Sequence, residues 1–220
     1  MTLQAILFDL DGTLIDQFEA IHKAFSRTIS SMGIAPPSYE EVKRSVGGAS
    51  DATMAKLIGH ERAEEAVSIL RPIFEEEMFN GLRVLPYVME GLEELCRQGL
   101  QCAVLTNKHG PHARSACDHL GLSKFLKFTT GANDTKWKKP DPNLTKLALR
   151  EIGVSRKQTV YVGDSPYDYE TARNSNLSCH LVATGTHSFN ELSELKAQST
   201  HQDFKSLTDH LLTVRQGNVR

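Results

Sequence analysis

The sequence has few cysteines, no long apolar run and almost no net charge, and each absence excludes a class of protein. The four cysteines, Cys96, Cys102, Cys117 and Cys179, have no metal-binding or redox spacing, which favours reduced thiols in a cytoplasmic protein. No stretch approaches the ~20 apolar residues of a membrane-spanning helix, and no secretion signal opens the chain. With a net charge of -2, no general field attracts nucleic acid or a membrane surface.

What the sequence does have is an ordinary globular composition and a regular series of short apolar runs. Hydrophobic residues make up 40% of its 220 residues and charged residues 24%, enough for one large domain or two small ones. Apolar runs bounded by turn residues predict buried strands at residues 5–8, 101–105, 128–130, 159–162 and about 179–182. From residue 86 onward these runs alternate with helical patterns. The fold class is therefore α/β, with a parallel sheet covered on both faces.

The segment from residue 17 to residue 82 follows a different pattern. Its apolar residues recur at helical spacing, as at Phe18, Ile21, Ala24 and Phe25, and no convincing strand interrupts them. It stands between the first two strands of the sheet. The sequence therefore predicts a Rossmann-like core of residues 1–16 and 83–220, with residues 17–82 inserted as an all-helical, closing cap. Its hinges would lie near residue 16 and residues 82–85.

Polar side chains follow the strands at the points where they end. Asp9 follows the first strand, Thr106 the second and Asp164 the fourth, whereas Lys139 follows the third strand after a loop. In open parallel sheets, ligands bind outside the carboxyl ends of the strands. Chain direction alone therefore predicts that these four residues gather at one edge of the sheet.

This arrangement resembles the haloacid dehalogenase superfamily, in its phosphatase branch. The matching stretches, in the order and spacing of the family's four motifs, are Asp9-Leu10-Asp11-Gly12-Thr13, Thr106, Lys139-Pro140 and Gly163-Asp164-Ser165 with Asp168. The resemblance covers nearly the whole chain. The subgroup that it most resembles is the phosphoglycolate phosphatase-like one, which carries a helical cap after the first motif.

The resemblance implies a role for each acidic residue. Asp9 would take the phosphoryl group as an aspartyl-phosphate, and Asp11 would protonate the leaving oxygen and then activate water. Mg²⁺ would bind to Asp9, Asp164 and the backbone carbonyl of Asp11. Asp168 would orient metal-bound water, with a plain first-turn acid at a helix N-terminus as the alternative.

The charge on a transferring phosphoryl group calls for fixed donors and cations. The resemblance implies that Thr106 supplies a hydroxyl, Asn107 a backbone amide and Lys139 a positive charge. Lys108 either contacts substrate or lies on the surface. In the cap, Arg44 is a candidate to meet a second anion of the substrate, with a surface position as the alternative.

These residues predict a Mg²⁺-dependent phosphatase that hydrolyses a small phosphorylated metabolite, either phosphoglycolate-like or a sugar phosphate. A sugar phosphomutase on the same scaffold is the first alternative, although mutases of this family usually carry an apolar residue where this chain has Thr13. A non-catalytic phosphate-binding regulatory module is the second, but such proteins typically lose a nucleophile or a metal ligand. The sequence carries no signal for an oligomeric state.

One pair of residues departs from the family's pattern. After the fourth-motif helix the family usually has Ala-Gly, whereas this chain has Ser175-Asn176. Glycine there would serve a left-handed helix end, and asparagine is the residue that best tolerates that conformation after glycine. The substitution predicts the same helix end at a small cost in stability.

Overall fold

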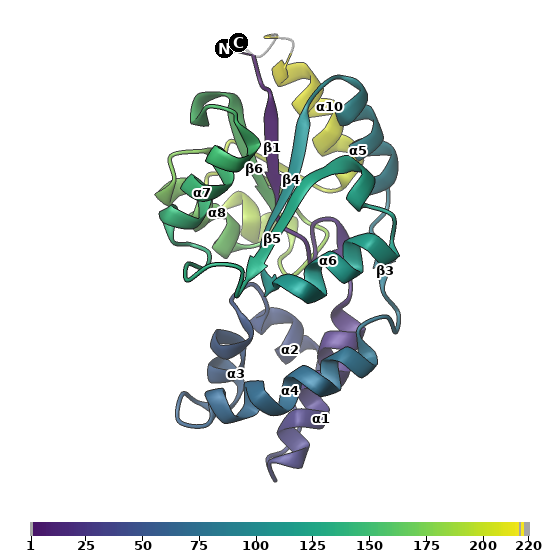
Figure 1. Ribbon diagram of the computed structural model, residues 1–220, viewed down its shortest axis with the longest axis vertical. Coiled ribbons are helices and arrows are strands. Elements are labelled where there is room, and N and C mark those ends of the chain that lie inside the picture. The colour runs from purple at the N-terminus through teal and green to yellow at the C-terminus, as the bar shows by residue number, and fades with distance from the viewer. Residues whose placement is uncertain (1, 216, 218–220) are drawn as a thin grey trace.

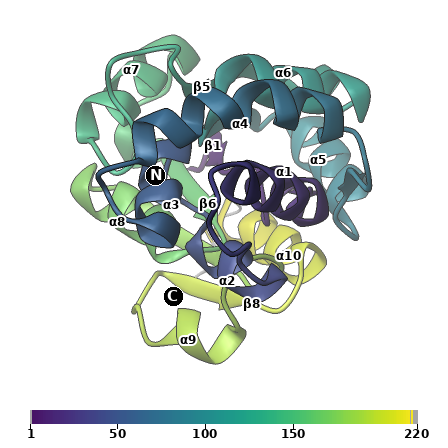
Figure 2. The same ribbon diagram turned by 90° about the horizontal axis from the view of Figure 1, so that it is seen from below.

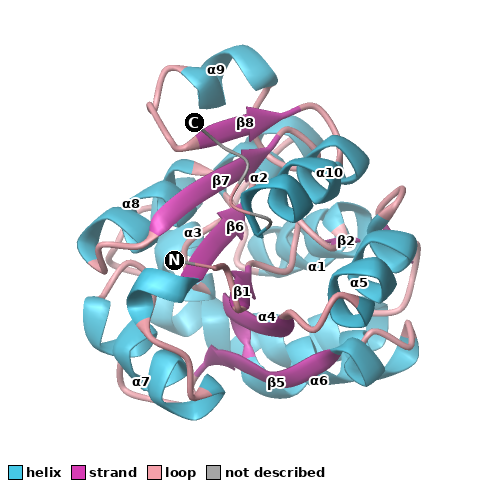
Figure 3. Ribbon diagram, turned by 90° about the horizontal axis from the view of Figure 1, so that it is seen from above, coloured by secondary structure: helices cyan, strands magenta, loops and turns pink. Residues whose placement is uncertain are grey.

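A six-stranded parallel sheet forms the centre of the molecule (Figures 1 and 3). The computed structural model describes residues 2–215 and 217. The strands of the sheet are Ala5–Phe8 (β1), Gln101–His109 (β4), Leu126–Ala132 (β5), Thr159–Gly163 (β6), Ser178–Val182 (β7) and Ser199–His201 (β8). Their order in space is β5-β4-β1-β6-β7-β8, so the chain order reverses at β1, between β4 and β6. In such sheets the ligand crevice lies where the order reverses, outside the carboxyl ends of the strands.

Helices cover both faces of the sheet, as the α/β pattern predicted. One face is covered by Val88–Arg97 (α5), Gly110–His119 (α6) and Phe204–Arg215 (α10), and the other by Pro142–Ile152 (α7) and Pro166–Asn174 (α8). The fully buried strand β1 serves both layers, because successive side chains point to opposite faces. Ile6 and Phe8 pack on the first face, and Ala5 and Leu7 pack on the second.

Local sequence signals fix the helix ends next to the site. The Asp141 side chain accepts a hydrogen bond from the Asn143 amide and so caps α7, which ends at Gly153 with a φ of 72°. Helix α8 begins with a capping box between Ser165 and Asp168. It ends as expected from the Ser-Asn pair, since Asn176 adopts the left-handed conformation with a φ of 52°.

Residues 17–82 form four helices with a hydrophobic core of their own (Figures 1 and 2). The helices are Phe18–Ser31 (α1), Tyr39–Ser45 (α2), Ser50–Ile58 (α3) and Ala63–Glu77 (α4). The apolar face expected on α1 is buried against α4 and its neighbours. In the view of Figure 2 these helices lie in front of the sheet edge where β1 ends.

The two connections to this helical segment pair with each other. Ile15–Asp16 (β2) and Arg83–Val84 (β3) form a two-stranded antiparallel sheet, and the Arg83 guanidinium pairs with the Asp16 carboxylate. Both chain crossings therefore run side by side, at the positions where the sequence placed hinges.

Four short elements have no counterpart in the sequence-based expectation: strands β2, β3 and β8 and the helix Phe189–Ser193 (α9). Two 3₁₀ turns, Ser123–Phe125 (η1) and Arg156–Gln158 (η2), precede strands. The expected second strand is also too short, because β4 continues beyond Leu105 to His109. Among the described helices, none combines the length and apolar character needed to cross a bilayer.

Candidate active site

The residues that the sequence placed at strand ends lie together at the carboxyl edge of the sheet. Asp9 directly follows β1 and Asp164 directly follows β6, which is paired with β1. Thr106 lies within β4 rather than after it, because that strand is longer than expected. All three side chains are buried, with exposed fractions of 5% or less.

Lys139 joins two of the carboxylates. Its Nζ lies 2.7 Å from Asp9 Oδ1 and 2.8 Å from Asp168 Oδ1, and all three side chains are almost fully buried. Burial alone would lower the pKa of Lys139, but Asp168 and Asp9 together raise it well above its ordinary value. The lysine is therefore a fixed positive charge beside Asp9.

Asn107 holds the Lys139 loop in place. Its side-chain oxygen accepts from the Lys139 amide at 2.8 Å, and its side-chain nitrogen donates to the Lys139 carbonyl at 3.1 Å. The same nitrogen donates to the Gly47 carbonyl of the helical segment at 3.0 Å. The Asn107 side chain thus links its own strand, β4, to the Lys139 loop and to the Gly47 loop of the helical segment.

Asp164 lies in a close-fitting cradle. Its Oδ2 accepts from the Thr186 amide at 2.7 Å and from the Thr186 hydroxyl at 2.9 Å. A Cβ atom on Gly185 would lie 2.0 Å from this oxygen, and one on Gly12 would lie 2.7 Å from it. Only glycine fits at these two positions, so the backbone closes around the carboxylate and fixes its direction.

Asp168 both caps its helix and holds Lys139. Its Oδ2 accepts from the backbone amides of Asp164 and Ser165 and from the Ser165 hydroxyl, while Oδ1 receives Lys139. Asp168 is therefore a first-turn acid of α8 that also contacts Lys139, and its expected role in orienting metal-bound water stays a prediction.

Asp9, Asp164 and Asp168 form a buried cluster that can hold a metal ion. One carboxylate oxygen from each lies within 4.8 Å of the others. Burial raises the pKa of Asp9 to about 6, although the Lys139 ammonium opposes the shift. Burial, Asp168 and Asp9 raise the pKa of Asp164 well above its ordinary value. The Lys139 ammonium contacts only two of these three carboxylates, and a divalent cation would balance the remaining negative charge.

The donor set fits a hard cation. Apart from its ion pair with Lys139, no hydrogen bond reaches the buried Oδ1 of Asp9 among the described residues, and carboxylate oxygens are the ligands such ions prefer.

Asp11 and Lys108 form a second ion pair at the front of the site. Lys108 Nζ lies 3.1 Å from both carboxylate oxygens of Asp11, and both side chains are 10% exposed or less. Of the two alternatives for Lys108, a surface position is therefore wrong. The pair holds the Asp11 carboxylate over the same edge as Asp9.

A cavity of about 410 Å³ opens over these residues, between the sheet edge and the helical segment. Asp9, Asp11, Thr106 and Lys108 line its floor, and Phe25, Val67 and Phe74 of the helical segment are among the residues on its other walls. Enclosed volumes of this order accommodate small molecules. The cavity therefore joins the reactive groups to residues 17–82.

Arg71 brings a positive charge to this cavity from helix α4. Its Nη1 lies 3.0 Å from His109 Nε2, and the Asn133 amide, oriented with its oxygen toward Arg71, accepts from Nη2 at 3.3 Å. Burial, His112 and Arg71 itself lower the pKa of His109 to about 4, so that ring is neutral near pH 7. Among the described residues, no carboxylate forms an ion pair with Arg71, unlike several other arginines.

Arg44 lies elsewhere. Its guanidinium pairs with Glu191 of α9 and donates to the Thr186 carbonyl at 2.8 Å, and its side chain is not among those that line the cavity. The substrate contact expected of Arg44 stays a prediction, and its place here is that of a link between the helical segment and the core.

Comparison with known proteins agrees with this geometry. A family model described as haloacid dehalogenase-like hydrolase matches residues 6–182. The chain belongs to this family. Curated relatives of this hydrolase include the phosphoglycolate phosphatase of Rhodospirillum rubrum, 29% identical over 99% of this chain and 94% of its own. Another is the phosphoglycolate phosphatase of Rhodobacter capsulatus, 28% identical over 92% of this chain and 94% of its own.

Solved structures show the same fold for this hydrolase. A haloacid dehalogenase-like family protein from Streptococcus pneumoniae aligns with a TM-score of 0.86 at 22% identity, covering 94% of this chain and 98% of its own. CbbY from Rhodobacter sphaeroides aligns with a TM-score of 0.79 at 22% identity, and the alignment covers 93% of this chain and 96% of the CbbY chain.

Proposed function

We propose that this hydrolase is a Mg²⁺-dependent phosphatase that acts on a small phosphate monoester through an aspartyl-phosphate on Asp9. The observation that carries the proposal is the position of Asp9. Its carboxylate lies on the floor of a cavity, beside a buried ammonium and two further buried carboxylates. The curated relatives, which are named phosphoglycolate phosphatases, support the reaction class.

The chain's own residues account for both chemical steps. An Asp9 carboxylate oxygen attacks phosphorus, and the bond from phosphorus to the ester oxygen breaks while Asp11 donates its proton to that oxygen. Asp11 then takes a proton from water, whose oxygen attacks phosphorus and releases phosphate and the Asp9 carboxylate. The charge on the phosphoryl oxygens is stabilised by the Lys139 ammonium, the Thr106 hydroxyl and the backbone amide of Asn107.

The metal would be held by Asp9, Asp164 and the Asp11 carbonyl, with Asp168 orienting its water. Mg²⁺ bound there supplies positive charge that balances the carboxylates and the phosphoryl group.

The helical segment, residues 17–82, acts in this proposal as a cap domain on the core of residues 1–16 and 83–220. Its hydrophobic core is separate, and both of its connections run through the β2–β3 pair. Movement about this pair would open the cavity to substrate and close it before phosphoryl transfer, which excludes bulk water. The substrate would be a small cytoplasmic metabolite, because a closed cap leaves no room for a polymer.

Arg71 points to a substrate with a second anion. It lines the cavity with no carboxylate partner among the residues that the structure describes, and guanidinium groups bind carboxylates through two parallel hydrogen bonds. A phosphate monoester that also carries a carboxylate, such as phosphoglycolate, matches a cavity with a phosphoryl site at Asp9 and a cation at Arg71.

A panel of phosphate monoesters assayed with the purified protein and Mg²⁺ tests the proposed function. We expect kcat/KM to be highest for small esters that carry a carboxylate, and phosphate to be released from each good substrate. Interconversion of sugar phosphates without phosphate release would indicate the mutase instead, and no turnover of any ester would indicate the non-catalytic module.

Arg71→Ala should raise KM for phosphoglycolate by about tenfold or more, because a charge-assisted pair is lost. The KM for p-nitrophenyl phosphate, which has no second anion, should change much less. Arg62→Ala is the matched control, since Arg62 belongs to the same segment but pairs with Glu65 on the exposed surface. An equal rise of KM for both esters would exclude a second-anion site at Arg71.

Thr186→Val should raise the Mg²⁺ concentration for half-maximal activity by about tenfold or more. The substitution removes the hydroxyl that orients Asp164, and such outer contacts typically contribute 10–100-fold in metal affinity. Thr145→Val is the control, because the Thr145 hydroxyl is also buried but has no hydrogen-bond partner in the structure. A Mg²⁺ dependence unchanged in Thr186→Val would remove Asp164 from the metal site.

A further inference from the structure

Three histidines meet on the α10 side of the sheet, outside the proposed active site. His180 belongs to β7, His201 ends β8 and His210 lies on α10. None of them lines the active-site cavity. The neighbours of His180 in the strand, Cys179 and Leu181, pack on the opposite face of the sheet, so alternation directs His180 toward α10.

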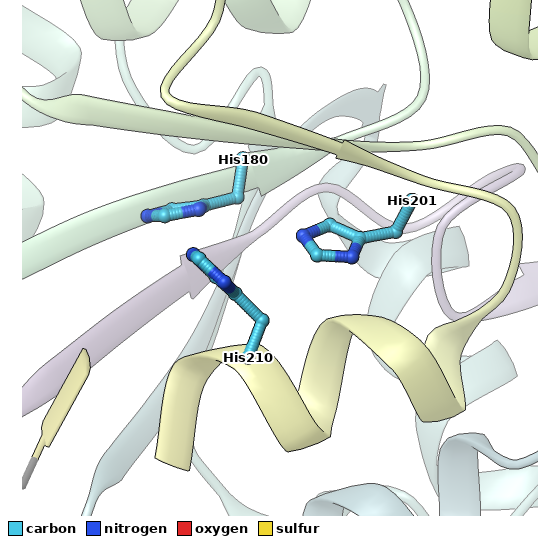
Figure 4. A group of neighbouring side chains, drawn as sticks. All are labelled: His180, His201 and His210. Carbon is cyan, nitrogen blue, oxygen red and sulfur yellow. The ribbon is translucent and has the colours of Figure 1, made fainter. Parts of the chain in front are cut away.

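The three side chains lie next to one another (Figure 4). One nitrogen from each ring lies within 4.8 Å of the other two. The ring centres of His180 and His210 are 5.3 Å apart, and those of His201 and His210 are 5.0 Å apart. The cluster thus joins the last two strands of the sheet to the last helix.

Hydrogen bonds within the protein do not satisfy this cluster. The Ser199 hydroxyl oxygen lies 2.7 Å from His180 Nδ1 and 2.7 Å from His201 Nε2. One nitrogen of His180 and one of His201 therefore have a hydrogen-bond partner. His210 Nε2 is buried and has no hydrogen-bond partner among the described residues. A buried polar atom without a partner is costly, and a ligand bound there would remove the cost.

The rings are in the protonation state that binds metals. Burial and the neighbouring imidazoles lower the pKa of His180 to about 3 and that of His201 to about 4. Burial also lowers the pKa of His210. Near pH 7 all three imidazoles are neutral and each keeps a nitrogen lone pair.

We propose that His180, His201 and His210 together bind a zinc ion. Imidazole nitrogens are ligands of zinc, and three of them with one water complete a tetrahedral site. Zinc–nitrogen distances of about 2.0–2.1 Å require the three nitrogens to approach one another from their present spacing. In this proposal the side chains rotate on binding the ion, and the Ser199 hydroxyl is released from one of the rings. His201 and His210 are partly exposed, which gives the ion a route to the cluster.

The bound ion would tie the short strand β8 and helix α10 to β7. Strand β8 is only three residues long and lies at the edge of the sheet, where it pairs with β7 alone. Its three residues are partly exposed, so it has little buried apolar surface to hold it. A metal that binds the folded cluster more tightly than the unfolded chain stabilises the fold.

Zinc titration of the full-length, chelator-treated protein tests the proposal. The measurement is competition with a chromophoric chelator, in excess Mg²⁺ so that the Asp9 cluster is occupied. We expect one zinc ion per chain. His210→Gln and His201→Gln should each weaken zinc binding by at least about tenfold, whereas His60→Gln, at an exposed histidine outside the cluster, should not.

Co²⁺ identifies the ligands. The parent protein and an Asp164→Asn variant should both show the intense visible absorption of a tetrahedral nitrogen site, and His210→Gln should lose it. Zinc should also raise the Tm of the parent and of His60→Gln but not that of His210→Gln, while the metal-free Tm of His210→Gln shows that it folds. No zinc binding by the parent, or equal binding by His210→Gln, would overturn the proposal. So would a Co²⁺ spectrum that disappears only in Asp164→Asn. All these readouts are independent of phosphatase activity.

Discussion

Asp9→Asn should lower kcat by about a thousandfold or more while the protein stays folded. An amide has nearly the shape of the carboxylate but cannot form the phosphoenzyme, and removal of a nucleophile typically has effects of this size or larger. The fold should tolerate the change, because the buried Asp9 carboxylate is costly and Lys139 keeps its contact with Asp168. Steady-state kinetics measures the first effect and thermal unfolding the second.

Asp209→Asn is the matched control for this experiment. Asp209 is exposed on α10, where it forms an ion pair with Lys205, so the activity and the Tm of the variant should stay close to those of the parent. Turnover by Asp9→Asn above about a tenth of the parent rate would mean that another group is the nucleophile.

Removal of divalent cations should abolish activity, and added Mg²⁺ should restore it. The three buried carboxylates of Asp9, Asp164 and Asp168 lie beside the Lys139 ammonium, which contacts two of them, and a phosphoryl dianion adds further negative charge. Without a cation, these charges repel one another in a medium that screens them poorly. The measurement is the rate after treatment with a chelator and after stepwise return of Mg²⁺.

Ca²⁺ should inhibit in the same assay. It takes more oxygen ligands than Mg²⁺, at longer distances, so both oxygens of Asp9 can bind it and neither is left to attack. Full activity in excess chelator would contradict the metal site at Asp9 and Asp164, and full activity with Ca²⁺ alone would contradict the proposed geometry of attack.

The floor of the site was predictable from the sequence because chain direction determines it. Asp9 and Asp164 follow neighbouring parallel strands, and the carboxyl ends of such strands must lie at one edge. The same reasoning places Thr106 and the loop of Lys139 at that edge. Short-range signals, such as the capping box formed by Ser165 and Asp168, determine where α8 begins.

The upper part of the site depends on how residues 17–82 pack on the core, which no local pattern specifies. Arg44 and Arg71 are both long cations on amphipathic helices, and the sequence alone does not tell which of them faces the cavity. Packing directs Arg44 to Glu191 and Arg71 to His109. Trp137 packs on the hydrophobic layer beneath α7 and α8.

The two residues that enclose the Asp164 carboxylate were also not predicted from the sequence, for a different reason. Gly185 and Thr186 lie in a loop after β7, more than 20 residues from the carboxylate that they enclose, and only the close approach of two backbones makes them necessary. Strand β8 was missed because its Ser-Thr-His sequence has no apolar alternation.

Trapping the covalent intermediate tests the central claim most directly. The enzyme is mixed with p-nitrophenyl phosphate and Mg²⁺, quenched in acid during turnover and treated with borohydride, which reduces an acyl phosphate to an alcohol. Peptide mass spectrometry then locates the reduced residue. The proposed mechanism predicts homoserine at position 9, formed only when substrate and Mg²⁺ are both present and absent from Asp9→Asn. A reduced residue at any other position, or none at all in an enzyme that is turning over, would contradict it.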